Sequence, residues 1–473
     1  MLALATIFFV NYYILAMKKG QRFETSLPII LINTFFIAGY YVANSLTGAG
    51  VNEVVKFQLL TSWEGTGYGE FIPQLLLSLL YILITMVLVF IASKKSTTKN
   101  NYFVTIVGLI AILINPTTSD FYEWFRPYTH FAEIDSITIS KLKNNSKVVL
   151  SEKPKSFIYI YAESFERTFF NEEIFPGLVT ELKKKDSTYI DFTNVEQVYG
   201  TGSTMMGMVA SQCGVFSVPS ITGEFMGGIS CLGNKLQDAG YDLHYIQGGA
   251  LDFAGTREFY TNHGFKNLTG ISYFRKKYKE DKYFSQWGVY DEYLLKESFQ
   301  RYRKLKSENK PFGLFLVTLD THYPKGHKSP LCDLKYEDGK NPYLNAIKCS
   351  DSNIASFIKQ VLEEDNGETL IILASDHLAL KTTASHLLKS IPRRNLLRFY
   401  NLEKQNVNNL KPASTLDIGT TLLHALGIRD QLGVGVNLFT NEKTLLERYE
   451  RKTNNFLRSL TPKIEEASLT SRK

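Results

Sequence analysis

Long runs of apolar residues occupy the first quarter of the chain. Four stretches stand out, at residues 2–17, 27–46, 72–92 and 102–114. About twenty helical residues cover the roughly 30 Å hydrocarbon layer of a bilayer. The second and third stretches reach that length, the first is close to the minimum, and the fourth is short but strongly apolar. The pattern predicts about four transmembrane helices within residues 1–115.

Basic residues predict the orientation of these helices. They follow the first stretch (Lys18, Lys19, Arg22) and the third (Lys94, Lys95, Lys99). The loop between the second and third stretches holds three acidic residues and one lysine. The positive-inside rule therefore places both basic loops in the cytoplasm and everything after Ile114 outside. A cleaved signal peptide is the alternative for residues 2–17, although no basic residue precedes them.

After residue 153 the pattern changes to alternating strands and helices. Strands are expected at 157–161, 244–247, 312–319 and 369–374, and helices at 205–213, 232–239, 290–306 and 353–363. This alternation predicts an α/β domain with a mainly parallel central sheet. We expect residues 116–153 to form a linker, 154–442 this α/β domain, and 443–473 a peripheral helix or a loose tail.

The composition limits the cellular compartments and the kinds of partner that we expect for this protein. The chain has 473 residues and a net charge of +7, with basic residues interspersed among acidic ones. That distribution excludes a nucleic-acid-binding footprint. The spacing of the four cysteines suggests two local disulfides, Cys213–Cys231 and Cys332–Cys349, which would persist in an oxidising compartment. Four unrelated buried thiols are the alternative.

Side chains of metal-ligand type follow three of the predicted strands. Glu163 follows the first, His322 follows the strand at 312–319, and Asp376 and His377 follow the last. The carboxyl ends of parallel strands share one edge of a sheet, where functional groups gather. Carboxylates with one imidazole suit zinc or manganese. Taken singly, each residue has an ordinary explanation as a helix cap, a turn or a surface histidine.

The segment 197–214, QVYGTGSTMMGMVASQCG, runs from a Gly- and Thr-rich loop into a predicted helix. We expect Thr204 to be the N-cap of that helix, at the positive end of its dipole. Backbone N–H groups there favour a phosphate, and a metal would activate the threonine hydroxyl as a nucleophile. An ordinary capping threonine is the alternative interpretation of this segment.

The sequence around these residues resembles the bacterial phosphoglycerol transferase I family. Members of that family decorate periplasmic glucans, and the family is related to lipoteichoic acid synthases and lipid A phosphoethanolamine transferases. The resemblance covers about residues 46–438. It rests on YAESFERTFFN at Glu163, GTGSTMMGMVASQCG at Thr204, VTLDTHYP at His322, SDHLA at Asp376, WGVYD at Trp287 and PASTLDIGTTLLHALG near Asp417.

The resemblance implies an alkaline-phosphatase/sulfatase-like fold with one tightly bound divalent metal, Mn²⁺ or Zn²⁺, with Mg²⁺ as a further option. Its implied ligands are Glu163, Thr204, Asp376 and His377. Thr204 is the implied nucleophile, with Thr201 as a rival. His322 would contact the substrate and take part in catalysis, and we expect Arg257 and Trp287 to contribute to substrate binding.

The implied reaction moves a phosphoglycerol group from phosphatidylglycerol to a glycan hydroxyl through a phosphoglyceryl-threonine. We expect a multi-pass protein of the bacterial inner membrane with its catalytic domain in the periplasm, and no nucleic-acid partner.

Three departures from the family affect the donor and the acceptor. The glycerol-site arginine of lipoteichoic acid synthases has no clean match, because Thr256 falls near its place with Arg257 adjacent. The text at 433–438, GVGVNL, differs from the family's usual Gly-x-Gly-Arg-Ser-Leu. We also expect no counterpart of the family's C-terminal domain, so a surface polysaccharide such as O-antigen or capsule joins periplasmic glucan as an expected acceptor.

Three other functions stay open. A phosphoethanolamine transferase would use the same metal and threonine. A hydrolase of the same fold, either a phosphodiesterase or a sulfatase, is the second, although the sulfatase motif C/S-x-P-x-R does not occur at the loop. A membrane-anchored protein that kept the fold without its chemistry is the third.

Overall fold

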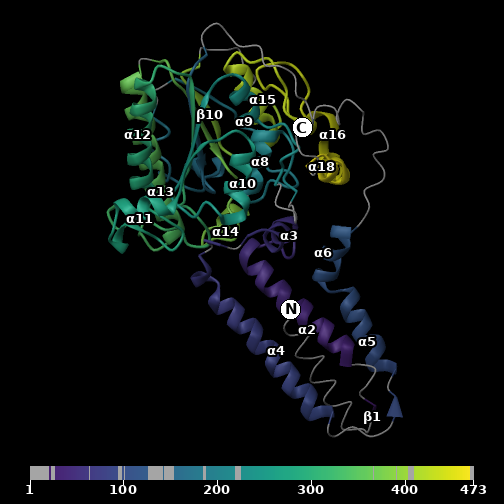
Figure 1. The fold of residues 1–473 in the computed structure, drawn as a ribbon. Helices are drawn as coiled ribbons and strands as arrows, with labels where there is room; N and C mark the ends of the chain where they lie inside the picture. The colour runs from purple at the N-terminus through teal and green to yellow at the C-terminus, as the bar shows by residue number, and fades with distance from the viewer. Residues whose placement is uncertain are drawn as a thin grey trace. The chain divides into compact units, whose positions relative to one another are not determined.

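The computed structural model describes residues 21–22, 27–62, 64–65, 67–93, 99–100, 102–125, 142, 154–184, 188–218, 225–365, 367–389, 391–402 and 410–468. Contacts divide the chain into two compact units. The first comprises 1–56 and 68–127, and the second comprises 57–67 and 128–473. Figure 1 shows the elements of both.

The first unit is helical, with a two-residue parallel pairing of β1 (Gln21–Arg22) and β2 (Lys99–Asn100). Its helices are α2 (Leu27–Thr47), α4 (Ile72–Ser93), α5 (Tyr102–Leu113), α6 (Pro116–Phe125) and the start of α3 (Glu53–Leu60). The expected helices at 27–46 and 72–92 are confirmed as α2 and α4. Both are long and apolar enough to cross a membrane, and only 11% of the α4 window is buried.

The prediction of about four spans finds support for two among the described residues. The stretch 2–17 lies outside the described part of the chain. The stretch 102–114 forms α5, whose 12 residues are fewer than a span requires. The helix is short because Asn115 and Pro116 interrupt the apolar run, and the chain starts a new helix, α6, at Pro116.

A seven-stranded sheet with the order β4-β10-β9-β3-β8-β6-β7 organises the second unit. All pairings from β9 to β7 are parallel, and only β10 runs against its neighbours, so the predicted mainly parallel sheet is confirmed. The strands are β3 (Phe157–Ala162), β4 (Tyr189–Asp191), β6 (Asp242–Gln247), β7 (Asn267–Thr269), β8 (Phe312–Val317), β9 (Leu370–Ser375) and β10 (Leu397–Tyr400). A second sheet pairs β5 (Val195–Glu196) with β11 (Ala413–Ser414).

Helices cover both faces of the large sheet, which is why its central strands are continuously apolar (Figure 1). On one face, Ile158 and Ile160 of β3 join a core with α12 (Asp291–Ser307) and α13 (Pro342–Asp365). On the other face, the Tyr161 hydroxyl lies 2.8 Å from that of Ser211. Ser211 belongs to α8 (Thr204–Cys213), which packs with α9 (Leu232–Asp238) and α15 (Ile418–Ala425). Shorter helices are α10 (Thr256–Asn262), α11 (Ile271–Lys277) and α14 (Ser385–Leu388).

The end of the described chain forms α16 (Leu445–Tyr449), α17 (Thr453–Ser459) and α18 (Thr461–Ser468). Phe456, Leu457 and Ile464 are buried. The side chain of Asn454 accepts a hydrogen bond from the backbone of Tyr199, at 2.9 Å. Of the two alternatives for residues 443–473, peripheral helices therefore describe the part up to Ser468.

Both expected disulfides are present, and Cys213–Cys231 joins the end of α8 to the start of α9. We predict that replacing Cys213 and Cys231 together by alanine lowers the free energy of unfolding by about 3 kcal/mol, because the bond closes a loop of 18 residues in the unfolded chain. Denaturant unfolding followed by circular dichroism measures this loss. An unchanged midpoint and slope would contradict it.

Candidate active site

The candidate site lies at the carboxyl ends of three adjacent strands. Glu163 directly follows β3, Asp376 and His377 directly follow β9, and His322 lies in the loop after β8. Strands β9, β3 and β8 are neighbours in the sheet. Their parallel pairing brings together side chains that are far apart in the sequence, as the strand ends predicted.

Glu163, Asp376 and His377 form one compact buried cluster. Each offers a ligand atom, and these atoms all lie within 4.8 Å of one another. The His377 Nε2 atom is 3.5 Å from a carboxylate oxygen of Glu163 and 3.5 Å from one of Asp376. The side-chain exposure of all three residues is 1% or less. Burying two carboxylates this closely is unfavourable without a compensating cation.

Hydrogen bonds around the cluster leave particular atoms available to a metal. The Nδ1 atom of His377 lies 2.8 Å from the Leu378 carbonyl, which can only accept, so the Nε2 lone pair faces the cluster. The Asp376 Oδ1 atom accepts from the backbone N–H groups of Ser164 (2.8 Å) and His377 (2.7 Å). Its Oδ2 atom is buried and has no hydrogen-bond partner among the described residues. This donor set suits one divalent cation.

The loop after β3 is held on both sides. The Glu163 N–H donates to the Thr318 hydroxyl at 3.0 Å, and the Thr321 hydroxyl donates to the Glu163 carbonyl oxygen. Ser164 adopts a positive φ of 52° and donates its hydroxyl to Glu163 Oε1 at 2.7 Å. A serine in this sparsely populated conformation is typical of backbone held by surrounding contacts at a functional site.

Thr204 lies against this cluster. Its hydroxyl donates to Glu163 Oε2 at 2.9 Å and is 3.5 Å from His377 Nε2. The prediction that Thr204 is the N-cap was wrong: Ser203, with extended φ and ψ of −146° and 165°, caps α8, and Thr204 is the first helical residue. The shift of one residue directs the hydroxyl toward Glu163 instead of toward the N–H groups of its own helix.

Thr201, the rival nucleophile, is engaged within its own loop. Its hydroxyl donates to the Val198 carbonyl at 2.7 Å and accepts from the Val198 N–H at 3.1 Å. The side chain is fully buried. These local bonds form a turn that shapes the approach to α8.

The start of α8 is pressed against the strand that carries the ligands. A Cβ atom at Gly207, one turn into the helix, would lie 1.9 Å from the Asp376 carbonyl oxygen. Only glycine allows this approach. It brings Thr204 within hydrogen-bond distance of Glu163, and it also directs the N-terminal N–H groups of α8 toward the site.

The mutual charges of the cluster shift its pKa values strongly. Burial and the charge of Glu163 raise the pKa of Asp376 to about 8. Burial lowers the pKa of His377, but the charges of Asp376 and Glu163 outweigh it and raise the value to about 9. Burial likewise opposes ionisation of Glu163, yet the positive charge of His377 holds its pKa well below the usual range. Without a metal, the cluster therefore carries bound protons at neutral pH.

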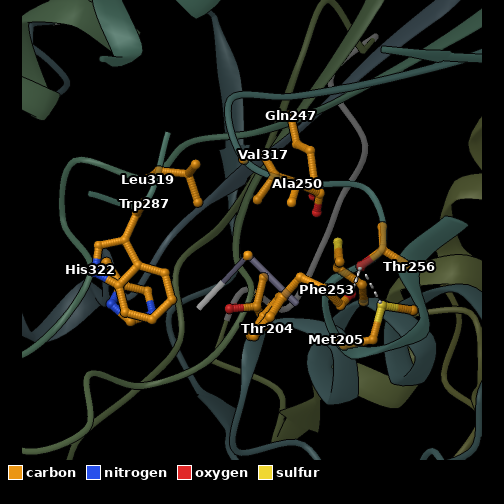
Figure 2. A pocket seen from close by; sticks show the side chains of 13 residues that line it. Thr204, Met205, Gln247, Ala250, Phe253, Thr256, Trp287, Val317, Leu319 and His322 are labelled. Atoms are coloured by element: carbon orange, nitrogen blue, oxygen red, sulfur yellow. Dashed lines mark hydrogen bonds between the residues drawn. The ribbon is translucent and has the colours of Figure 1, made fainter. Parts of the chain in front are cut away.

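A mostly apolar pocket adjoins Thr204 (Figure 2). Gly65, Thr204, Met205, Met208, Gln247, Gly249, Ala250, Phe253, Thr256, Trp287, Val317, Leu319 and His322 line it. The His322 ring lies against the Trp287 indole, with ring centroids 3.7 Å apart. The Trp287 indole N–H is buried and has no acceptor among the described residues.

His322 is buried, and its Nδ1 atom lies 2.8 Å from the Tyr323 carbonyl oxygen. Because that carbonyl can only accept, Nδ1 carries the proton and Nε2 has a free lone pair. Burial lowers the pKa of His322 below its ordinary value, so the ring is neutral at pH 7.

Of the expected substrate-binding residues, His322 and Trp287 line the pocket and Arg257 does not. The Arg257 side chain is half exposed and pairs with Asp252. Its neighbour Thr256 lines the pocket and donates its hydroxyl to the Phe253 carbonyl at 2.7 Å. The role of Arg257 in binding stays a prediction.

Several residues that line the pocket were not predicted from the sequence. Gln247 ends β6, and the same strand-end argument that selected Glu163 would have selected it. No comparable signal marks Phe253 or Leu319, because apolar loop residues are common throughout such a domain. A second group of ligand-type side chains, Cys213, Cys231 and His263, offers no thiolate, because the two sulfurs are bonded to each other.

The chain belongs to the sulfatase family, which it matches over residues 155–428. Residues 1–135 match the family described as "Phosphoglycerol transferase I, N-terminal domain".

Individual relatives agree with these matches. Phosphoglycerol transferase I of Salmonella choleraesuis (strain SC-B67) is 31% identical in an alignment 458 residues long, which covers 92% of this chain and 59% of that protein. A protein of the alkaline phosphatase superfamily from Vibrio parahaemolyticus shares the fold with a TM-score of 0.53, 20% identity and coverage of 66% of this chain and 76% of that one. The lipoteichoic acid synthase LtaP from Listeria monocytogenes has a TM-score of 0.52, 15% identity and coverage of 72% and 100%.

We predict that Gly207→Ala weakens Mn²⁺ or Zn²⁺ binding by about tenfold or more, because the added Cβ pushes α8 from Asp376 and disturbs the orientation of the ligands. Calorimetric titration of the metal measures the change. Gly39→Ala is the matched control, since Gly39 is also helical and a Cβ atom added there would meet nothing within 4 Å. Equal affinities in the wild type and Gly207→Ala would contradict the prediction.

We also predict that metal affinity increases with pH. Raised pKa values of about 8 for Asp376 and about 9 for His377 mean that both groups hold protons at pH 7 that a metal must displace. Affinity should therefore rise between pH 7 and pH 9, by about tenfold per pH unit for each proton released, and level off above that range. Titration in buffers of different ionisation enthalpy counts the protons. A pH-independent affinity without proton release would refute this assignment.

Proposed function

We propose that this protein is a membrane-bound phosphotransferase that moves phosphoglycerol from phosphatidylglycerol to a glycan hydroxyl, with Thr204 as the nucleophile. The observation that carries the proposal is the position of the Thr204 hydroxyl, 2.9 Å from Glu163 within the buried ligand cluster and at the start of α8. The similarity to phosphoglycerol transferase I over 92% of the chain supports the choice of transferred group.

A divalent metal, Mn²⁺ or Zn²⁺, fits the residues present. Glu163, Thr204, Asp376 and His377 would hold it. The atoms best prepared to do so are Asp376 Oδ2, which accepts no hydrogen bond from the described residues, and His377 Nε2. When bound, such a metal lowers the pKa of a coordinated hydroxyl and offsets negative charge on phosphoryl oxygens. Mg²⁺ is the alternative. It is a hard cation that prefers oxygen ligands, so the imidazole of His377 disfavours it.

In the first step, the Thr204 hydroxyl gives up its proton and its oxygen attacks the phosphorus of phosphatidylglycerol. A new bond forms between that oxygen and phosphorus, and the bond from phosphorus to the diacylglycerol oxygen breaks. Diacylglycerol leaves with its oxygen and takes up a proton, and phosphoglycerol stays on Thr204 as a diester. Because α8 begins at Thr204, its first N–H groups would stabilise the negative charge that develops on the phosphoryl oxygens.

In the second step, a hydroxyl of the acceptor attacks the same phosphorus and releases Thr204. Neutral His322 supports a role as the general base, because its Nε2 lone pair is free to take the proton of that hydroxyl. Its lowered pKa keeps it in the basic form at neutral pH. The released Thr204 oxygen regains a proton, and the enzyme returns to its starting state.

The lining of the pocket favours a neutral headgroup over a cationic one. No described residue that lines it carries a carboxylate or a positive charge. An ethanolamine ammonium would lose its water there without gaining an anionic partner. A glycerol hydroxyl can instead accept a hydrogen bond from the Trp287 indole N–H, which has no acceptor among the described residues. This favours phosphoglycerol over the phosphoethanolamine alternative.

Two apolar helices and two disulfides support a location in the inner membrane with the catalytic domain outside the cytoplasm. The exposed side chains of α4 are almost all apolar, as expected for a helix facing lipid rather than a soluble core. Disulfides persist outside the cytoplasm. We infer an inner-membrane protein with a periplasmic catalytic domain. The chain covers 59% of the length of its Salmonella relative, so we propose the acceptor only as a class, a glucan or surface polysaccharide hydroxyl.

We predict that purified protein with Mn²⁺ and phosphatidylglycerol forms a phosphoglyceryl adduct that Thr204→Ala abolishes and Thr201→Ala retains. The reason is that Thr204 faces Glu163, whereas Thr201 bonds within its own loop. Intact-mass spectrometry detects the adduct, and peptide mapping locates it. Both variants should keep the wild-type melting temperature to within a few degrees.

The other outcomes separate the alternatives. An adduct formed only from phosphatidylethanolamine would replace the donor and leave the nucleophile unchanged. Turnover to free glycerol phosphate at a rate that added glycan does not alter would identify a hydrolase. An adduct retained in Thr204→Ala and lost in Thr201→Ala would overturn the choice of nucleophile.

A further inference from the structure

The described residues 57–62, 64–65 and 67 belong to the second compact unit, although they lie between α2 and α4 in the sequence. The ring of Phe57 lies 6.1 Å from that of Phe225, measured between centroids. The Ser62 carbonyl oxygen accepts a hydrogen bond from the Ala254 N–H at 3.2 Å. Gly65 is one of the residues that line the pocket beside Thr204. The loop between the two candidate spans therefore forms part of the pocket.

Two glycines bring this loop into contact with the pocket wall. Gly65 has a φ of +81°, and a Cβ atom there would lie 2.3 Å from the Ala250 Cβ atom. A Cβ atom at Gly67 would lie 2.7 Å from Cε2 and 2.8 Å from Nε1 of Trp287. Neither approach is compatible with a larger residue unless its neighbours move. Gly65 lines the pocket directly, and Gly67 lies behind Trp287, which also lines it.

Trp287 connects Gly67 to His322 of the candidate active site. The Trp287 indole that Gly67 touches lies against the His322 ring, with centroids 3.7 Å apart. Gly67 therefore packs against the Cε2–Nε1 edge of the indole, while His322 packs against its rings. The loop therefore affects both the space for the headgroup and the position of its proposed hydrogen-bond donor.

We propose that the loop containing Gly65 and Gly67 is a specificity-determining wall of the headgroup pocket, which admits a small uncharged polyol because these two positions carry no side chain. The proposal rests on the proposed function, since it assumes that the headgroup of the donor enters this pocket. It adds that the residues selecting the headgroup belong partly to the loop that leads into α4 at Ile72.

The test uses Gly65→Ala in the whole chain, with vesicles of phosphatidylglycerol or phosphatidylmethanol as donors. The added methyl group takes space from glycerol but little from the much smaller methanol. We expect kcat/KM for phosphatidylglycerol to fall by about tenfold or more, and for phosphatidylmethanol by several-fold less, because one methyl group in a pocket changes discrimination by about 10- to 200-fold. Release of diacylglycerol measures both rates.

Two further variants separate lost space from backbone strain. Ala250→Gly combined with Gly65→Ala removes the methyl group that the new Cβ would meet, and it should restore most of the preference for phosphatidylglycerol. Gly240→Ala is the matched control, because Gly240 has a φ of +80° and nothing within 4 Å of an added Cβ. It should strain the backbone equally and leave the ratio of the two rates at the wild-type value.

Binding of sn-glycerol 3-phosphate to the Mn²⁺-loaded proteins, by calorimetry, gives a readout that does not depend on turnover. Weaker binding in Gly65→Ala, restored by Ala250→Gly, supports the wall even if no lipid is turned over, in which case only the proposed reaction fails. Equal losses for both lipid donors, or unchanged binding of glycerol phosphate in Gly65→Ala, would overturn the proposal.

Discussion

Two carboxylates and an imidazole, buried with their ligand atoms within 4.8 Å of one another, are the constraint on which the rest of the site depends. Charges at this spacing in a buried site repel or attract too strongly to be left without protons or a cation. The surrounding structure meets this demand by supplying backbone N–H groups to Asp376 Oδ1 and a carbonyl to His377 Nδ1, while leaving Asp376 Oδ2 and His377 Nε2 available.

The fold delivers these groups through the parallel sheet and then refines their positions through close backbone contacts. Adjacent strands place Glu163 and Asp376 at one edge of the sheet. Thr204 instead belongs to helix α8, which covers one face of the sheet. That helix reaches hydrogen-bond distance because Gly207 lets its first turn touch the Asp376 carbonyl. The same device recurs at Gly65, where bare backbone lines the pocket. Absent side chains are therefore as important to this site as the polar groups.

Strongly patterned parts of the chain were predictable, and parts that depend on distant contacts were not. The buried strands that precede Glu163 and Asp376 were identified because five or six consecutive apolar residues end abruptly in polar ones. Helix α13 begins at Pro342, whereas the sequence pattern predicted a start near residue 353. The first half of the helix was missed because it buries polar residues such as Asp351, which accepts hydrogen bonds from the backbone N–H groups of residues 180–182. When a remote loop provides hydrogen bonds to buried polar residues, the helix no longer shows the regular apolar periodicity from which helices are predicted.

The sequence alone was enough to identify four strands of the large sheet, the two long apolar helices, the likeness to known transferases and the side chains able to hold a metal, because these follow from local periodicity and residue chemistry. The tertiary structure was needed to show that Thr204 faces Glu163 while Thr201 bonds within its loop, that Arg257 pairs with Asp252 and does not line the pocket, and that Gly65 does line it. These outcomes depend on which backbones approach most closely, and such distances arise from packing between segments that the linear pattern does not relate.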